Sequence, residues 1–479
     1  MKNQKLFDGV TGIRDDLVQK AENSRPRAKR AWWSGAVAAV LALAIFAGLT
    51  LRPETSPVFV AQALATPTYP VMPQYPDQSR YFSGTVQDSD GFNSALTAWR
   101  EGLAAQARYT GYEQGLEDFL TRSAEEFLTA KPGENLVYSP LNVYMALAML
   151  AEVTGGESRE QILSLLGSES LDALRSQAND LWNDHYRQDG ASTSVLASSL
   201  WLDKDIAYRQ ETVDALAEHY YAATFQGNMG SEDYNKMLQD WLNEQTGGLL
   251  QDQVSQIAMD PETVLALAAT IYFKSKWSAE FSEDRTEAGV FHTAKGDVTA
   301  DFMHQSQTRN YFWGEGFTAI SRNLEIGGQM WLILPDEGVT PEMLLENGEA
   351  MEFLLKNGNW ENSKFLRVNQ SIPKFDVSSQ MDLKAGLQEL GITEVFAADA
   401  DFSPMLESGG VTLSKVQHDA RVTIDEEGVT AAAYTVMMMA GGTMPPNEEV
   451  DFILDRPFIF SITGSRGLPL FTGVVNTPS

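Results

Sequence analysis

Residues 425–446 are the part of this chain whose residue types best fit a chemical event, which here would be cleavage of the chain itself. The first half, Asp425 to Thr435, is rich in small residues and suits a strand that must slide between other strands. The second half, Val436 to Pro446, combines methionines and glycines with a Pro-Pro stop. This segment therefore offers a peptide bond in an accessible loop, as bait for a protease.

The secondary structure of the same segment is ambiguous from composition. Ala431–Ala433 and Met437–Met439 favour a helix, whereas Val422–Ile424 and Val429–Thr430 favour a strand. Gly428 would interrupt either element. Taken alone, the window predicts either a strand or a buried helix with a stripe of methionines in the core.

The elements that would position this segment come from a series of motifs in a fixed order. These are Asn135 to Val143 leading into an apolar helix from Tyr144 to Glu152, Gly155 to Ser158, Ile271 to Trp277, Ile372 to Val377, Leu387 to Ile392, Leu413 to His418, Asp455 to Phe460 and Gly473 to Asn476. Together with residues 425–446 they resemble the serpin family of serine protease inhibitors. The resemblance implies an α+β fold with mixed sheets, a central sheet able to accept the reactive loop, and surrounding helices.

The resemblance also assigns roles to residues. It implies a hinge formed by Glu426, Glu427, Gly428, Val429, Thr430, Ala431, Ala432 and Ala433, and a region where the central sheet opens, with Ser139, His418 and Trp277. The family's scissile bond follows the fifteenth residue counted from the hinge glycine, which gives Gly442–Thr443 as the reactive bond. A shift of register would use Met439, Ala440, Gly441 or Met444 instead.

Strand geometry is compatible with insertion of the loop into a sheet. The fourteen residues Val429 to Gly442 would span about 46 Å at ~3.3 Å per residue. Alternation would send Val429, Ala431 and Ala433 to one face, and this face carries no charge as far as Met439. Val429 replaces the Thr or Ser that the family commonly has there, and Ala269 replaces its usual asparagine, so the control of insertion could differ.

These features predict an extracellular inhibitor that traps its protease as a suicide substrate. No Lys or Arg lies between Arg421 and Arg456, so pockets for small or apolar side chains, as in elastase-like or subtilisin-like proteases, are favoured over trypsin-like ones. The alternative is a non-inhibitory serpin that serves as a binding module on the cell surface. Hinges of such relatives tend to carry bulky, charged or proline residues, which Gly428 to Ala433 lack.

We expect neither an enzyme nor a metal or cofactor site. The five histidines occur singly, and no serine lies in a Gly-x-Ser-x-Gly elbow. The chain has no cysteine, which excludes a disulfide framework and thiol catalysis.

The N-terminus predicts a membrane anchor. Ala31 to Leu51 is a run of 21 uncharged residues, and at ~1.5 Å per helical residue it would span roughly 30 Å of hydrocarbon. The preceding thirty residues contain eight Lys or Arg and four acids, which orients the N-terminus to the cytoplasm. A buried helix, or a signal peptide cleaved after Ala63 to give a secreted protein, is the alternative.

We therefore expect a cytoplasmic tail at 1–30, a transmembrane helix at 31–51, an extracellular proline-rich linker at 52–112 and a serpin domain at 113–479. The rest of the chain, after the tail, contains 27 basic and 61 acidic residues. This excess of negative charge disfavours nucleic acid as a partner. The expected partners are a serine protease, held as a covalent acyl complex, and the membrane. A monomer on a bacterial cell surface is compatible with these features.

Overall fold

The computed structural model of this chain describes residues 61–83, 86–106, 115–190, 192–248, 250–324, 328–407, 411, 413, 416–429, 448–464 and 466–478. Three groups of predicted features lie outside these residues: the tail and anchor at 1–51, hinge residues Thr430 to Ala433, and the reactive bond Gly442–Thr443 with its alternatives Met439, Ala440, Gly441 and Met444. Within the described ranges, no helix is both long and apolar enough to cross a membrane.

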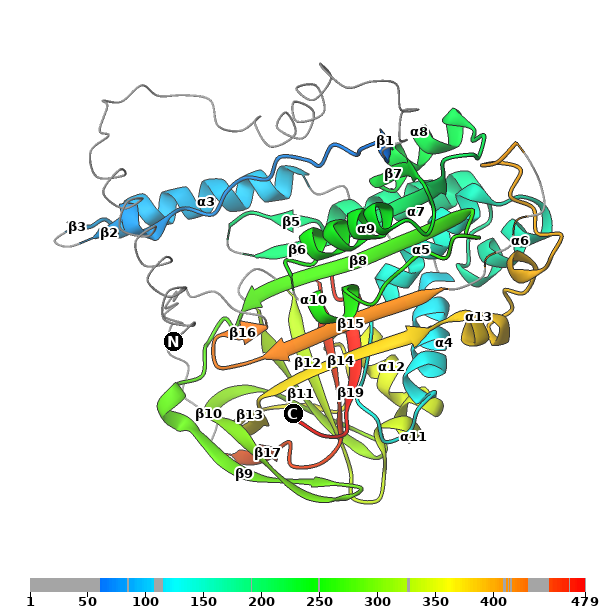
Figure 1. Ribbon diagram of the computed structural model, residues 1–479. Coiled ribbons are helices and arrows are strands. Elements are labelled where there is room, and N and C mark those ends of the chain that lie inside the picture. The colour runs from blue at the N-terminus through cyan, green and yellow to red at the C-terminus, as the bar shows by residue number, and fades with distance from the viewer. Residues whose placement is uncertain are drawn as a thin grey trace, which may run out of the picture. The chain divides into compact units, whose positions relative to one another are not determined.

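The central sheet has the strand order β1-β7-β6-β8-β16-β15-β14, with β5 paired to β6 (Figure 1). Its strands are β1 (Gln62–Ala65), β5 (Arg187–Gln188), β6 (Thr193–Asp203), β7 (Ala222–Gly227), β8 (Leu265–Lys276), β14 (Phe375–Asp382), β15 (Gln417–Ile424) and β16 (Gly428–Val429). β15 and β16 confirm the strand interpretation of the ambiguous window for the residues described there.

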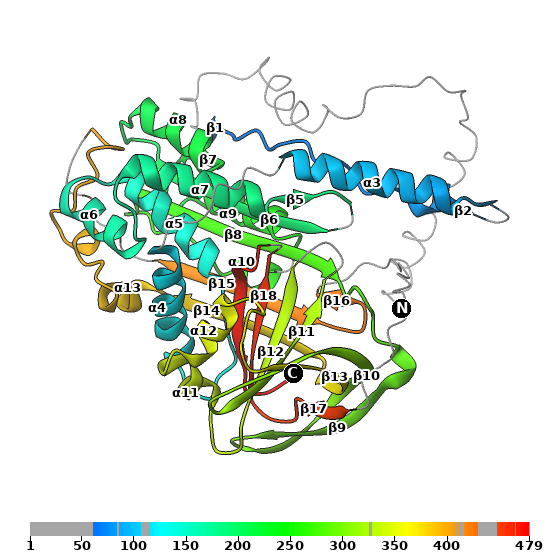
Figure 2. The ribbon, with the colours of Figure 1, turned by 180° about the vertical axis from the view of Figure 1, so that it is seen from behind.

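A second sheet has the order β17-β13-β10-β11-β12-β18-β19-β4, with β9 paired to β10 (Figure 2). Its strands are β4 (Leu136–Tyr138), β9 (Thr286–Thr293), β10 (Gly296–Gly314), β11 (Phe317–Asn323), β12 (Gln329–Pro335), β13 (Ser363–Pro373), β17 (Glu449–Ile453), β18 (Phe458–Thr463) and β19 (Pro469–Val475). A small hairpin joins β2 (Phe82–Ser83) to β3 (Val86–Gln87).

Helices cover these sheets. They are α3 (Ser89–Gln106), α4 (Gly115–Thr129), α5 (Pro140–Val153), α6 (Gly156–Leu165), α7 (Leu171–His185), α8 (Gln210–His219), α9 (Glu232–Gln245), α10 (Gln251–Val254), α11 (Pro341–Glu346), α12 (Glu349–Leu355) and α13 (Lys384–Glu389), with 3-10 turns η1 (Gln78–Arg80), η2 (Glu283–Arg285) and η3 (Glu394–Phe396). The expected α+β fold with mixed sheets is confirmed.

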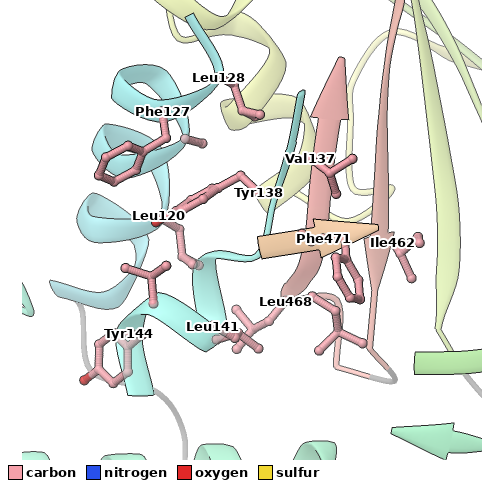
Figure 3. Packing of buried hydrophobic residues seen from close by; sticks show 14 of the residues in the cluster. Leu120, Phe127, Leu128, Val137, Tyr138, Leu141, Tyr144, Ile462, Leu468 and Phe471 are labelled. Atoms are coloured by element: carbon pink, nitrogen blue, oxygen red, sulfur yellow. The ribbon is translucent and has the colours of Figure 1, made fainter. Parts of the chain in front are cut away.

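Helix α5 is the centre of the core, because nearly every one of its residues is buried. A helix that is apolar all round must be enclosed by other elements, and here α4, β4 and β19 lie around its N-terminal half (Figure 3). Leu120, Tyr138, Leu141 and Phe471 all belong to the cluster of buried hydrophobic residues shown there. The sequence predicted this helix from Tyr144 to Glu152, and its true start is Pro140.

The predicted linker differs from expectation in its second part. We call residues 61–83 and 86–106 the N-terminal strap. Its strand β1 pairs antiparallel with β7 at the edge of the central sheet. The ring of Tyr69 lies 5.1 Å from that of Trp182 and 5.5 Å from that of Tyr186, and burial raises the pKa of Tyr69 to about 12. Helix α3 begins at Ser89, within the residues predicted to form the linker. This part of the linker is folded onto the domain, because aromatic contacts hold it there.

We predict that Tyr69→Ala lowers the free energy of unfolding by about 2 kcal/mol, because it removes contacts with several aromatic rings. Val71→Ala is the matched control, since Val71 is 88% exposed, and it should change stability by less than about 0.5 kcal/mol. Urea unfolding measures both variants. Equal stability of the two variants would contradict the packing of the strap on the domain.

Candidate functional site

The hinge lies between two strands of the central sheet. Gly428 pairs with Lys276 and Val429 pairs with Ser275 of β8, while Val429 also pairs with Ile424 of β15. The short strand β16 is thus already inserted between β8 and β15 (Figure 1). The predicted hinge residues Glu426 to Val429 are therefore at the entrance to the sheet.

A tight turn precedes β16. One carboxylate oxygen of Asp425 accepts hydrogen bonds from the backbone N–H of Glu427 at 3.0 Å and of Gly428 at 3.1 Å. The backbone N–H of Asp425 donates to the carbonyl of Gly428 at 3.1 Å. An aspartate that bonds its own following amides stabilises a turn of this kind. The chain therefore reverses direction here without a longer loop.

Trp277 holds the outside of this turn. Its indole N–H donates to the carbonyl of Asp425 at 2.9 Å, and its backbone N–H donates to the carbonyl of Glu427 at 3.0 Å. The guanidinium carbon of buried Arg322 lies 4.9 Å from the centre of the indole ring, which is within the range of a cation–π contact. Trp277 therefore stabilises the turn at the entrance of the sheet.

Glu426 anchors the turn to the second sheet. Its carboxylate accepts hydrogen bonds from Lys374 Nζ at 2.8 Å and from the Thr286 hydroxyl at 2.8 Å. Burial raises the pKa of Glu426, but the hydrogen bonds from Lys374 and Thr286 outweigh it and leave the pKa below its usual value. The hydrogen bond to Glu426 in turn raises the pKa of Lys374. Both groups are charged at neutral pH, so this ion pair restrains the hinge.

Gly428 is required by close packing. A Cβ atom on this residue would lie 2.5 Å from the carbonyl oxygen of Ser275 and 2.7 Å from Cα of Lys276. Both are backbone atoms of β8, so neither can move aside as a flexible side chain would. Only glycine lets the hinge approach β8 this closely.

The edge of β8 that faces β16 is largely unpaired in the part of the chain that the structure describes. Two of its twelve residues pair with β16, whereas ten, Leu265 to Lys274, have a described partner only on the opposite side, in β6. No ladder joins β8 to β15 among the described residues. In the described part of the chain these two strands are therefore joined only through β16.

The side chains at this opening alternate in the way insertion requires. Val429 is buried in the main core. On β15 the residues of the same face, Ala420 and Val422, are buried too. On β8 the corresponding residues include Ile271 and Phe273, which are partly buried against the same core. A strand placed here would thus have one apolar face turned toward the core.

Ser139 and His418 meet at the other end of the opening. The backbone N–H of Ser139 donates to Nε2 of His418 at 3.0 Å, and the Ser139 hydroxyl donates to the carbonyl of Leu470 at 2.6 Å. Burial lowers the pKa of His418 to about 4. The imidazole is therefore neutral at pH 7, with Nε2 unprotonated. Trp277 is not part of this pair, because His418 lies at the start of β15 and Trp277 beside the hinge.

Sequence reasoning missed Asn142. Its side-chain amide donates to the carbonyl of Ala269 at 3.2 Å and so links α5 to β8. A cavity of about 50 Å³ lies beside this contact, lined by residues that include Leu267, Val416 and His418. Ala269 stands where the family usually has asparagine, and the asparagine that reaches this point comes from α5 instead. The available signal was a polar residue near the start of a mostly apolar helix.

Comparison with known proteins identifies the family. The family model for serpins, serine protease inhibitors, matches residues 114–478. A putative serpin-Z12 from Oryza sativa subsp. japonica is 31% identical over 72% of this chain and 86% of its own length. A leukocyte elastase inhibitor from Sus scrofa is 30% identical over 73% of this chain and 94% of its own length. The chain therefore belongs to the serpin family.

Solved structures agree with the fold. The thermophilic serpin tengpin in its native state matches with a TM-score of 0.67 and 24% identity, over 78% of this chain and 98% of its own. The Arabidopsis serpin AtSerpin1 in its native stressed conformation matches with a TM-score of 0.65 and 26% identity, over 76% of this chain and 97% of its own. The fold described above is thus the serpin fold.

We predict that acid pH lowers the free energy of unfolding of this protein because His418 is protonated in the unfolded chain. The pKa of His418 is about 4 in the folded protein and about 6.5 when unfolded. Between these values only the unfolded chain takes up the proton, so stability is lost as the pH falls below about 6.5. From pH 7 to pH 5 the contribution of His418 should fall by about 2 kcal/mol.

Urea unfolding at both pH values tests this contribution. His418→Gln should lose that part of the pH dependence, whereas the control His304→Gln, in β10, should keep it. If His418→Gln and the wild-type protein lost equal stability between pH 7 and pH 5, the assignment to His418 would be incorrect.

Proposed function

We propose that this chain is an inhibitor of serine proteases that acts by suicide-substrate trapping. A protease cuts the reactive loop, the freed strand inserts between β8 and β15, and the acyl-linked protease is carried away from its working geometry. The observation that carries this proposal is β16, which already occupies the first two positions of the opening, next to ten residues of β8 with no described partner on that side.

The register of β16 specifies where further residues would go. If the chain continued past Val429 in the same antiparallel register, Ala431 would face Phe273, Ala433 would face Ile271 and Met439 would reach Leu265. Odd-numbered residues would then turn to the core with Val429. This set is uncharged and begins with small side chains, so it can be buried without the desolvation cost of a charge.

The proposed targets are proteases with small or apolar specificity pockets, of the elastase or subtilisin type. The loop offers Ala440, Gly442 and methionines, and no basic residue. The proposal of protease inhibition is also supported by relatives such as the leukocyte elastase inhibitor. A non-inhibitory binding module on the cell surface is the second candidate, and the small uncharged residues of the hinge argue against it.

The first test is the covalent complex. We predict that elastase-like or subtilisin-like proteases give an SDS-stable complex with this chain and that trypsin gives none. Ala431→Glu should turn the inhibitor into a substrate, because the buried charge slows insertion while the acyl bond hydrolyses. The matched control Thr430→Glu places the charge on the opposite face, next to Lys274 in the proposed register, and should still trap protease.

Two outcomes would separate the candidates. If no protease of either class formed an SDS-stable complex, the binding module would be favoured. If Ala431→Glu trapped protease as well as Thr430→Glu did, trapping would not depend on insertion of this face.

The reactive bond Gly442–Thr443 has its own test. Mass spectrometry of the C-terminal fragment should find a new N-terminus at Thr443. Gly442→Arg should raise the rate of trypsin inhibition at least tenfold, because the residue in the specificity pocket sets most of the discrimination between proteases. A new N-terminus at Ala440, Gly441, Gly442 or Pro445 would instead place the cut after Met439, Ala440, Gly441 or Met444 and move the reactive bond to an alternative register.

We also propose that residues 31–51 anchor the chain, with the tail at 1–30 in the cytoplasm and the inhibitory domain outside the cell. The support is the uncharged run and the basic residues that precede it. Protease added to intact cells should remove the domain and leave the tail protected. A soluble secreted product that begins at Leu64 would contradict the anchor and indicate cleavage after Ala63.

A further inference from the structure

A cavity lies between the N-terminal strap and the body of the domain. It has a volume of about 450 Å³ and is lined on one side by Pro70, Met72 and Leu103 of the strap. On the other side it is lined by Asp184 and Arg187, at the end of α7 and in β5, and by Arg466 in the turn before β19. The strap residues precede the part of the chain that matches the serpin family, which begins at residue 114. None of the lining residues of this cavity belongs to the hinge or to β8, β15 and β16.

The two walls differ in chemistry. Met72 is buried and Leu103 is partly buried, and both pack against the main core. They offer an apolar surface. The opposite wall carries two guanidinium groups and one carboxylate. A cavity with an apolar wall and a few converging polar groups is typical of sites for small molecules, and the volume is in their usual range.

The charged groups around the polar wall are not all paired directly. The carboxylate of Asp184, almost fully buried, lies 3.4 Å from Nε of Arg466. Asp189, the next acid along the chain, accepts the backbone N–H of Ser192 at 2.9 Å. Among the described residues, the guanidinium of Arg187 has no hydrogen bond or ion pair, and Asp189 and Asp184 act on it only through space. One positive charge therefore faces the cavity without a direct partner.

Burial of a charge without a direct partner is costly. Burial lowers the pKa of the Arg187 guanidinium, the acids Asp189 and Asp184 oppose that effect, and Arg466 adds to it. Arginine remains charged at neutral pH in any case. A charge held partly out of water gains most from an anion that can accept its planar donors.

We propose that this cavity binds a small amphiphile with one carboxylate, whose carboxylate pairs with Arg187 and whose apolar chain lies along Met72 and Leu103. A single carboxylate matches the single unpaired guanidinium. An inorganic anion would satisfy Arg187 but leave the apolar wall unused. A neutral amphiphile would cover the apolar wall but leave Arg187 without an anionic partner.

Binding at this place would also fasten the strap to the body, because the two walls come from these two parts of the chain. A ligand that binds only the folded arrangement raises the midpoint of thermal unfolding in proportion to its saturation. The site would thus make the stability of the domain depend on an amphiphile, independently of protease inhibition.

Octanoate is the probe, and octanol is its uncharged counterpart. The full chain is placed in lipid nanodiscs, with protein-free nanodiscs as the blank, and binding is followed by calorimetry and by the shift of the thermal midpoint. We expect octanoate to bind roughly tenfold or more tightly than octanol, because a hydrogen bond to a charged group is lost with the alcohol. Inorganic phosphate at the same concentration should shift the midpoint less than octanoate does.

Three variants make the test specific. Arg187→Gln should remove the preference for octanoate over octanol, and Leu103→Trp should weaken both ligands by filling the apolar side. Arg100→Gln is the matched control, since Arg100 is exposed on α3 and does not line the cavity, and it should bind as the wild type does.

The proposal is overturned if octanoate fails to bind, if it binds Arg187→Gln as tightly as the wild type, or if phosphate alone gives the full shift. Circular dichroism shows whether each variant is folded. If Arg187→Gln did not fold, the comparison of octanoate with octanol on wild type and on Leu103→Trp would still decide the question.

Discussion

The facing edges of β8 and β15 are the constraint on which the rest of this structure depends. Backbone N–H and C=O groups in a sheet seek partners on both sides, and a typical hydrogen bond gained in folding contributes about 0.5–1.5 kcal/mol. Among the described residues, only the last two positions of β8 find such partners on the side that faces β15, and these are supplied by β16. Ten positions on this edge of β8 therefore have no paired strand among the described residues, and the proposed mechanism would use them.

Contacts at the two ends of the opening between β8 and β15 hold these strands in the arrangement described. At the hinge, Trp277 and the ion pair of Lys374 with Glu426 fix the turn that precedes β16. At the far end, the hydrogen bond between Ser139 and neutral His418 joins β15 to the start of α5. Asn142 fastens β8 to the same helix. In the proposed mechanism, insertion would have to extend β16 past these contacts, and they would then set how readily the sheet accepts the loop.

The sequence was informative where function depends on local residue type. Gly428 and the small residues after it predicted a hinge, and the structure explains the glycine by its close approach to the backbone of β8. Ser139 and His418 were predicted as a pair through the family resemblance. Trp277, predicted with them in the region where the sheet opens, lies beside the hinge, and this difference in position along the sheet could not be derived without the strand register.

The remaining features depend on long-range contacts that composition does not encode. The proline-rich residues after position 52 predicted a spacer, yet Tyr69 packs on Trp182, more than a hundred residues away in the sequence. The partners of Glu426 and Asn142 likewise come from distant strands. A single sequence shows that such side chains are polar or aromatic, but the choice of partner arises only when the sheets assemble.

Amide hydrogen exchange before and after cleavage of the loop tests the central claim most directly. The account predicts that cleavage strongly slows exchange in Leu265–Lys274 of β8 and in Gln417–Thr423 of β15, because a new strand supplies partners for these edges. The strands β12 and β18 of the second sheet should exchange as before. Unchanged exchange along both β8 and β15 in the cleaved protein would contradict insertion between them.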